Sequence, residues 1–262
     1  MSDARHDDAR LLAAIDRLER LERPQHDRAV AAAAEQQMQR WLLEHRGQAK
    51  GTPAAAGDSA ASIGPYVAIS REAGAGGSQT SRLLGEILGW NVLDGELIEC
   101  MAETYHTSPA MLELVDEKTT NSITEVFKSL REPHSLSQLQ YVSRASRMIF
   151  MAAHTGKVIF VGRGAGFILP GKCGLSVRLI AGHKYRVQQI MERRHLSFKE
   201  AEDYVTKTDA DRHALAQQYF HRDASDPHVY DMVINVERFG PQLAARQIAD
   251  AVASCLHLDL PS

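Results

Sequence analysis

The sequence lacks the features that mark secreted, zinc-binding and membrane-spanning proteins. It has only three cysteines, Cys100, Cys173 and Cys255, without C-x-x-C spacing, so neither a disulfide framework nor a zinc site is indicated. No apolar run approaches the ~18 residues that a membrane-spanning helix needs. Residues 1–8 are charged rather than apolar, which argues against a usual signal peptide. We therefore expect a cytoplasmic protein that does not bind membranes.

The chain also lacks a strong excess of either charge. Its formal net charge of −3 gives no basic surface that would suggest nucleic acid as a partner. Its 12 histidines are scattered without metal-ligand spacing, so we expect none of them to be catalytic. A hydrophobic content of 44% over 262 residues is sufficient for a full core, and a catalytic α/β domain commonly takes ~100–250 residues. The composition therefore fits one such domain with an extension.

The chain divides into a helical extension, a flexible linker and a domain. Residues 1–46 carry two helical apolar patterns separated by Pro24. Residues 47–64 are small and rich in glycine and alanine, which is typical of a linker, and residues 65–258 form the domain. We expect the extension to pack as a helical pair on its own domain or on a second copy, with docking to another partner as the alternative.

From residue 65 onward, short apolar runs alternate with helical patterns. This alternation predicts an α/β fold of the P-loop NTPase type, with a parallel sheet covered by helices on both faces. A helical insertion over about 95–155 separates the second strand from the third, and it is a natural place for an acceptor-binding subdomain. The predicted strands span 66–70, 91–93, 158–162, 176–181 and 232–235, and further helices span 78–88, 183–194, 197–218 and 241–256.

A glycine-rich turn follows the first predicted strand and precedes a helix, as in a phosphate-binding loop. Glycines let the backbone wrap an anion, and the helix N-terminus directs free N–H groups toward it. The turn departs from the pattern G-x-x-x-x-G-K-[ST] at two positions. Gly76 and Ser78 match the pattern, whereas Arg71 replaces the first glycine and Gly77 replaces the lysine. An equally ordinary role for such a turn is close packing of a helix against a strand.

Further motifs follow this loop in an order that resembles one family. Arg163 stands between two glycines at the end of the third predicted strand, and the run Tyr230-Asp231-Met-Val-Ile-Asn235 forms the fifth. With Ile69-Ser-Arg-Glu72 before the glycines, these motifs resemble the cytidylate kinase-like branch of the P-loop nucleoside monophosphate kinases over residues 65–256. That branch characteristically lacks the loop lysine, so the resemblance itself implies this departure.

The resemblance implies ATP with Mg²⁺ as the phosphoryl donor. The Ser78 hydroxyl would ligate Mg²⁺, although an N-cap serine is an equally common role. Arg71 is the nearest candidate for the missing cationic charge, because its fork can bind phosphate in a bidentate manner, and pairing with Glu72 is the alternative. The donor phosphates would lie on Gly74, Ala75, Gly76, Gly77, Ser78 and Gln79.

Two further residues would serve the acceptor, a nucleoside monophosphate with CMP or dCMP favoured. Asp94 would orient the acceptor phosphate or hold a metal-bound water, although Asp-Gly is also a common turn. Arg163 would bind the acceptor phosphate, because ligands bind at the carboxyl ends of strands in open α/β sheets. The alternative for Arg163 is a solvated loop arginine.

Residues of the later helices would complete the site. Arg193 and Arg194 could begin a lid, with one of the two expected to be only a surface cation. Asp209 and Arg212 lie three residues apart on one helical face and resemble residues that read the acceptor nucleotide, while an intrahelical ion pair is the alternative. Arg193 and Arg212 join Arg71, Asp94 and Arg163 as the expected catalytic residues.

Two functions remain open from the sequence. The first is an active nucleoside monophosphate kinase, favoured by the retention of its expected site residues. The second is a nucleotide-sensing protein that kept the fold and lost catalytic efficiency, with the N-terminal helices carrying the output. The missing lysine and the N-terminal extension favour this second function. We expect the enzyme.

Overall fold

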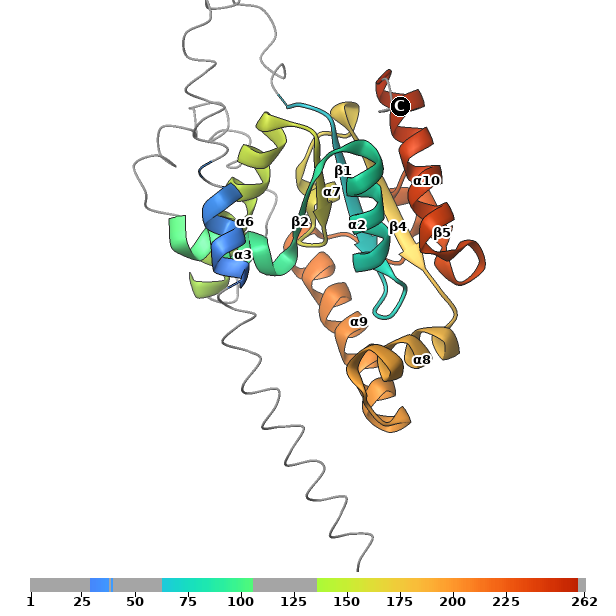
Figure 1. The fold of residues 1–262 in the computed structure, drawn as a ribbon. Helices are drawn as coiled ribbons and strands as arrows, with labels where there is room; N and C mark the ends of the chain where they lie inside the picture. The colour runs from blue at the N-terminus through green and yellow to red at the C-terminus, as the bar shows by residue number, and fades with distance from the viewer. Residues whose placement is uncertain (1–28, 38, 40–62, 106–135, 259–262) are drawn as a thin grey trace, which may run out of the picture.

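A computed structural model describes residues 29–37, 39, 63–105 and 136–258 of the chain. Within these residues the centre is a five-stranded parallel sheet with strand order β2-β3-β1-β4-β5 (Figure 1). The predicted α/β fold class is therefore confirmed, and every predicted strand overlaps an observed one. The strands are β1 (Tyr66–Arg71), β2 (Asn91–Asp94), β3 (Val158–Val161), β4 (Gly174–Ile180) and β5 (Met232–Asn235).

Helices connect and cover these strands. The predicted helical insertion over about 95–155 contains α3 and α6, and the part between them lies outside the described residues. Two short 3-10 helices, η1 (Gly171–Cys173) and η2 (Pro227–Val229), precede β4 and β5. The α-helices are α2 (Gly77–Leu88), α3 (Gly95–Tyr105), α6 (Leu136–Thr155), α7 (Ala165–Ile168), α8 (His183–Arg194), α9 (Phe198–Phe220) and α10 (Val236–Leu256).

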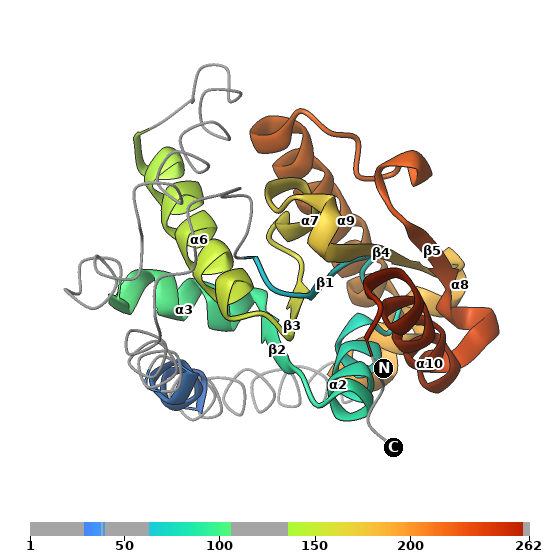
Figure 2. The same ribbon diagram turned by 90° about the horizontal axis from the view of Figure 1, so that it is seen from above.

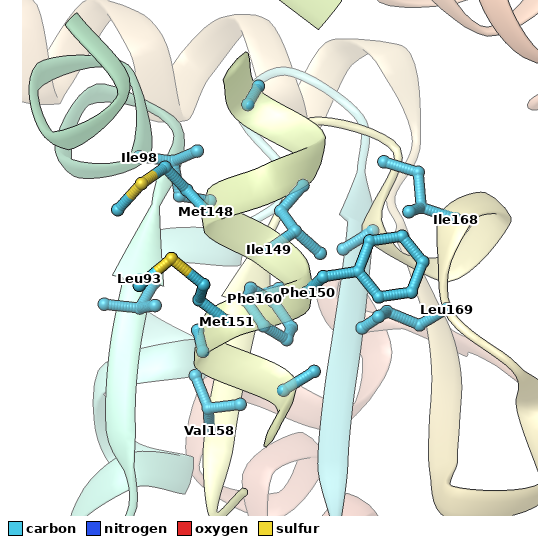
Figure 3. Packing of buried hydrophobic residues seen from close by; sticks show 14 of the residues in the cluster. Leu93, Ile98, Met148, Ile149, Phe150, Met151, Val158, Phe160, Ile168 and Leu169 are labelled. Atoms are coloured by element: carbon cyan, nitrogen blue, oxygen red, sulfur yellow. The ribbon is translucent and has the colours of Figure 1, made fainter. Parts of the chain in front are cut away.

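The sheet is buried on both faces, which explains the uninterrupted apolar runs of its central strands. Successive side chains of a strand point to opposite faces, so β1 and β3 each contribute to two hydrophobic clusters. One cluster lies under α3, α6 and α7, where the α6 segment Met148–Met151 packs over Leu93 and Phe160 (Figure 3). The other lies under α2 and α10 and includes Val67, Ile69 and Ile159.

The strand order places the glycine-rich loop at the carboxyl end of the central strand, in the middle of the sheet. All strands are parallel, so their carboxyl ends lie at the same edge, and β1 lies between β3 and β4. The chain continues from β1 through α2 to β2 on one side of β1, and later reaches β4 and β5 on the other. Such a switch point is where open α/β sheets bind ligands. Helices α8 and α9 project beyond this edge (Figure 1).

An N-terminal helical segment packs on the same domain. Residues 29–37 are helical (Figure 2). Ala34 is 1% exposed and belongs to the hydrophobic cluster that includes buried residues of α3 and α6. Most of the predicted extension over 1–46 and the predicted linker over 47–64 lie outside the described residues. The contact at Ala34 places this one helical segment on its own domain, and the packing of the predicted extension as a helical pair stays a prediction.

Removal of the N-terminal segment is expected to lower stability without unfolding the domain. A chain that begins at Ser62 keeps the sheet and both faces of its core but exposes the α3–α6 surface beside Ala34. Burial contributes ~0.8 kcal/mol per methylene-sized group, so we expect a loss of about 1 kcal/mol and a Tm lower by about 2–4 °C. Thermal denaturation measures this, and light scattering after size exclusion reports any accompanying change in oligomeric state.

Ala34→Asp in the full-length chain serves as the matched variant, since it disrupts the same contact without shortening the chain. We expect a similar fall in Tm. An unchanged Tm in both variants would contradict the packing of this helix on α3 and α6, and an insoluble truncated chain would place the extension in the core itself.

Candidate active site

Two glycines in left-handed conformations shape the loop between β1 and α2. Gly74 has a φ of 77° and Gly76 a φ of 73°, which residues with a Cβ rarely adopt. Gly76 is the N-cap of α2, no side chain caps the helix, and its first turn carries no acidic residue. The first four N–H groups of a helix have no intrahelical partner, so this turn presents hydrogen-bond donors and a positive dipole end to an anion.

The side chains of Ser78 and Gln79 are exposed in the first turn of α2. Because the N-cap is Gly76, the N-cap role considered for Ser78 is wrong. The Ser78 hydroxyl takes no part in closing the helix end. A hydroxyl oxygen at this position suits Mg²⁺, which typically takes one or two protein ligands and completes its shell with phosphate oxygens and water.

Arg71, the last residue of β1, extends its side chain across the start of α2. A Cβ placed on Gly77 would lie 2.7 Å from Cγ of Arg71, which is closer than real side chains approach. A Cβ on Gly162, just after β3, would overlap Nη1 of Arg71. Gly77 itself does not have a positive φ, so the space taken by Arg71 is the reason that no side chain fits there. The guanidinium group thus lies between the loop and the end of β3.

Three arginines, Arg71, Arg163 and Arg212, lie close enough at this place to act on one another electrostatically. Burial, followed by Arg212 and Arg163, lowers the pKa of Arg71 to about 9. Asp94 and Tyr204 oppose this shift without cancelling it. Burial also lowers the pKa of Arg212. The charged forms are disfavoured in the absence of an anion, which is the electrostatic condition of a phosphate-binding site.

Arg163 occupies a strained backbone position after β3. Its φ is 54°, and it stands between Gly162 and Gly164, whose φ values are 85° and 70°. A residue with a Cβ is uncommon in this conformation, and such strain concentrates at functional sites. Nε of Arg163 donates to the carbonyl oxygen of Gly95 at 3.4 Å, and a Cβ on Gly95 would lie 2.7 Å from that nitrogen. The side chain is therefore held across the start of α3, beside Asp94 and Arg71, and is not a freely solvated loop arginine.

Asp94 closes the N-terminus of α3. Its Oδ1 accepts a hydrogen bond from the backbone N–H of Leu97 at 2.9 Å, the contact of an N-cap residue. The Asp-Gly turn considered from the sequence is thus part of its role. The Asp94 side chain is exposed and acts electrostatically on Arg71, so it also belongs to the arginine cluster.

Asp209 and Arg212 tie α9 to the loop. Asp209 accepts a hydrogen bond from the backbone N–H of Ala73 at 2.7 Å, and Nη1 of Arg212 donates to the carbonyl oxygen of Arg71 at 3.0 Å. The intrahelical ion pair considered for these two residues is therefore not their main interaction. Both fix the path of the chain between β1 and the glycines.

Arg186 of α8 is a site residue that the motif analysis missed. It is only 9% exposed and donates to the carbonyl oxygens of Ala181 and Ala73 at 3.0 and 3.2 Å. It also pairs with Asp209 and lies 3.4 Å from a carboxylate oxygen of Glu72. The available signal was its place on the apolar stripe of α8 that holds Val187 and Ile190. Glu72 thus pairs with Arg186 and lies 3.9 Å from Arg178, and the pairing with Arg71 considered from the sequence is not found among the described residues.

A second unpredicted network lies beside β1 on the β4 side. Nη1 of Arg178 donates to Oγ of Ser70 at 3.2 Å and to the Tyr230 hydroxyl at 3.4 Å. The Tyr230 hydroxyl also donates to the carbonyl oxygen of Ala224 at 2.9 Å. This network supports the end of β1 directly behind Arg71.

Arg193 and Arg194 are exposed in the last turn of α8. The guanidinium of Arg194 lies over the ring of Tyr204, 4.3 Å from its centroid. No contact between Arg193 and the arginine cluster is found within the described residues. The structure thus brings together Arg71, Asp94, Arg163 and Arg212, and it places Arg193 at the far end of the α8–α9 hairpin.

The part of the chain that the structure describes has neither a membrane span nor a cluster of metal ligands. It contains no helix long and apolar enough to cross a bilayer. It contains no group of three or more His, Cys, Asp or Glu side chains placed to hold a metal ion.

Solved structures with this arrangement share little sequence with the chain. An uncharacterized protein from Eubacterium ventriosum is 21% identical, with a TM-score of 0.58 over 72% of this chain and 98% of its own. A shikimate kinase from Bacteroides thetaiotaomicron is 12% identical, with a TM-score of 0.41 over 74% of this chain and 99% of its own. A shikimate kinase from Acinetobacter baumannii, solved with shikimate, is 16% identical, with a TM-score of 0.40 over 74% of this chain and 96% of its own.

Sequence comparison gives the family. No curated protein matches the chain significantly. Residues 66–238, which run from the start of β1 into α10 and contain the loop and the arginine cluster, match the cytidylate kinase-like family. The chain belongs to the cytidylate kinase-like family.

Proposed function

We propose that the protein transfers the γ-phosphate of ATP to a nucleoside monophosphate, with CMP or dCMP as the favoured acceptor. The observation that carries this proposal is the uncapped N-terminus of α2, which faces arginines from β1, from the end of β3 and from α9. A polyphosphate on the loop and a second anion beside Arg163 would both find positive partners there. Family membership supports a nucleotide as the substrate class.

The reaction needs alignment and positive charge more than covalent work from the protein. The donor phosphates would lie on the backbone N–H groups from Gly74 to Ser78. An oxygen of the acceptor phosphate, held by Arg163, would attack the γ-phosphorus, while the bond from that phosphorus to the β-phosphate oxygen breaks. ADP then leaves, and the acceptor becomes a nucleoside diphosphate. Arg212 would support the negative charge from the side of α9.

The residues present fit a magnesium ion brought in with ATP. The exposed Ser78 hydroxyl at the first turn of α2 would be its protein ligand. When bound, the ion neutralises part of the charge on the β- and γ-phosphates.

ATP with Mg²⁺ is expected to stabilise the protein against heat. A ligand at ~100 times its Kd contributes ~2.7 kcal/mol, which corresponds to a rise in Tm of roughly 5–10 °C for a domain of this size. A thermal-shift series with ATP, ADP and AMP measures this. No shift at millimolar ATP, with or without a monophosphate, would contradict nucleotide binding altogether.

A coupled assay of ADP release with each nucleoside monophosphate then tests the reaction and its acceptor. Turnover with CMP or dCMP above the other monophosphates supports the proposal. Stabilisation by ATP without turnover on any monophosphate would instead support the second candidate, a nucleotide-sensing protein, which the glycine at position 77 favours.

A further inference from the structure

We infer that Arg71 is the phosphoryl-binding cation of this loop and a catalytic residue of the proposed transfer, on which this inference rests. In the standard loop, a lysine at the position of Gly77 reaches the β- and γ-phosphates. Here the cation comes from six residues earlier, at the end of β1. Its side chain reaches the same space from the opposite side of the loop.

The positions of two glycines fix where this guanidinium lies. Its Cγ passes 2.7 Å from the point where a Cβ of Gly77 would be, and its Nη1 fills the space where a Cβ of Gly162 would be. Gly77 is the first residue of α2 and belongs to the proposed donor site, and Arg163 of the acceptor side follows Gly162. The guanidinium therefore bridges the two ends of the proposed site, where the transferred group would pass.

Arg71 is held in place through its backbone rather than neutralised through its side chain. Its carbonyl oxygen accepts from Arg212, and no ion pair of its guanidinium with a carboxylate was found among the described residues. Burial, Arg212 and Arg163 lower its pKa to about 9, with only Asp94 and Tyr204 acting in the other direction. A multiply charged phosphate would give this guanidinium a charged hydrogen-bond partner.

The buried charge of Arg71 should lower the stability of the ligand-free protein. The pKa of Arg71 in the folded protein is about 9, well below the ordinary value of an arginine, which applies in the unfolded chain. The folded state therefore binds fewer protons than the unfolded state between these pH values, and stability rises with pH across this window. Below pH 9 the full cost of the charge is present. At pH 7, Arg71→Met should raise the Tm of the ligand-free protein by about 2 °C or more, since ~1 kcal/mol corresponds to 2–4 °C.

The first experiment measures binding of inorganic tripolyphosphate and of ATP by calorimetry, together with Tm and turnover. Arg71→Met should weaken tripolyphosphate binding about 10-fold or more, which is the loss of one charge-assisted hydrogen bond of ~1.5 kcal/mol. It should also lower kcat more than 10-fold. Arg71→Lys keeps the charge but loses the two-pronged guanidinium group. Its tripolyphosphate affinity and its kcat should therefore lie between those of the wild type and those of Arg71→Met. Arg246→Met, at an exposed arginine of α10, is the matched control and should change none of these quantities.

The second experiment exploits the steric exclusion between positions 71 and 77. Gly77→Lys alone should lower Tm and turnover, because Cγ of Arg71 blocks the new side chain. In Arg71→Ala, the remaining Cβ lies 3.1 Å from the new Cβ, a contact that a small shift relieves. The double variant Arg71→Ala/Gly77→Lys should therefore recover at least 10-fold of the kcat lost in Arg71→Ala. Such non-additivity is the signature of two residues that share one space.

The outcomes separate this inference from the proposed function. Wild-type tripolyphosphate affinity in Arg71→Met would overturn the role of Arg71, whatever the turnover. Binding of tripolyphosphate that depends on Arg71, without transfer to any monophosphate, would overturn the proposed function and the catalytic role of Arg71, while it would support Arg71 as the phosphoryl-binding cation. A Gly77→Lys variant as stable and active as the wild type would overturn the steric exclusion.

Discussion

Replacement of Arg186 with methionine is expected to lower the free energy of unfolding by about 3 kcal/mol. Loss of one partner from a buried ion pair typically costs ~3–5 kcal/mol, because the other charge stays behind without its partner. The lower end applies here, since the Asp209 side chain is 30% exposed. Arg186 also donates hydrogen bonds to the carbonyl oxygens of Ala73 and Ala181. Its loss therefore removes the contact between α8 and the start of the glycine-rich loop.

Chemical denaturation of Arg186→Met, Asp209→Asn and the double variant measures this effect and its coupling. The double variant should be less destabilised than the sum of the single variants, because neither charge is then left unpaired. The exposed pair Arg82–Glu86 on α2, with side chains 64% and 57% exposed, provides the control. Arg82→Met should cost less than ~1 kcal/mol. If Arg186→Met lowered the free energy of unfolding by a similarly small amount, the inference that Arg186 and Asp209 hold α8, α9 and the loop together would be contradicted.

The sheet could be predicted from the sequence because β1 and β3 are buried on both faces. Such strands appear as short uninterrupted apolar runs, and their helical neighbours show a clear period. At α10 the predicted start at 241 matches the second of two helical parts. The element begins at Val236, but Gly240, with a φ of 71°, is not helical and separates a short first part from the part that begins at Pro241. A Gly-Pro pair normally separates elements, and here it marks a kink without an intervening loop.

The site could be predicted only where a residue follows a strand or a glycine-rich turn. Arg71 and Arg163 come at strand ends, which parallel sheets bring to one edge. Arg178 lies within β4, and its contact with Ser70 depends on the pairing of β4 with β1. No local pattern gives that strand order. Arg186 was missed for a related reason, since an arginine on a helix reads as a surface residue until the helix is placed against the loop.

The structure gives each of the two aspartates a backbone contact beyond the expected substrate contact, a local one for Asp94 and a long-range one for Asp209. The resemblance implies substrate contacts for Asp94 and Asp209, and both remain candidates for them. The structure adds that Asp94 caps α3 and that Asp209 binds the backbone of Ala73, a residue 136 positions away. Contacts over such separations follow from the packing of α9 on the sheet edge, which the spacing of residues alone does not reveal.

Loss of the Arg163 side chain is expected to raise the KM for the acceptor by about 10–100-fold, since a charge-assisted hydrogen bond contributes ~1.5–3 kcal/mol. Arg163→Gly is the sharper variant, because glycine adopts the φ of 54° at this position without strain. We therefore expect no loss of Tm in Arg163→Gly, together with a large loss of acceptor affinity. The KM for ATP should change far less, because the proposed site of the donor phosphates is the loop after β1.

Two further variants, Arg163→Ala and Arg246→Ala, separate the loss of the Arg163 charge from the backbone strain at this position. Arg163→Ala should show the same acceptor defect and a lower Tm, since alanine bears the backbone strain without the contact of Nε with Gly95. Arg246→Ala removes an exposed arginine from α10 and should change neither KM. Steady-state kinetics with the acceptor and ATP varied separately gives both constants. An unchanged acceptor KM and kcat in Arg163→Gly would show that another arginine of the cluster, with Arg212 the next candidate, binds the acceptor phosphate.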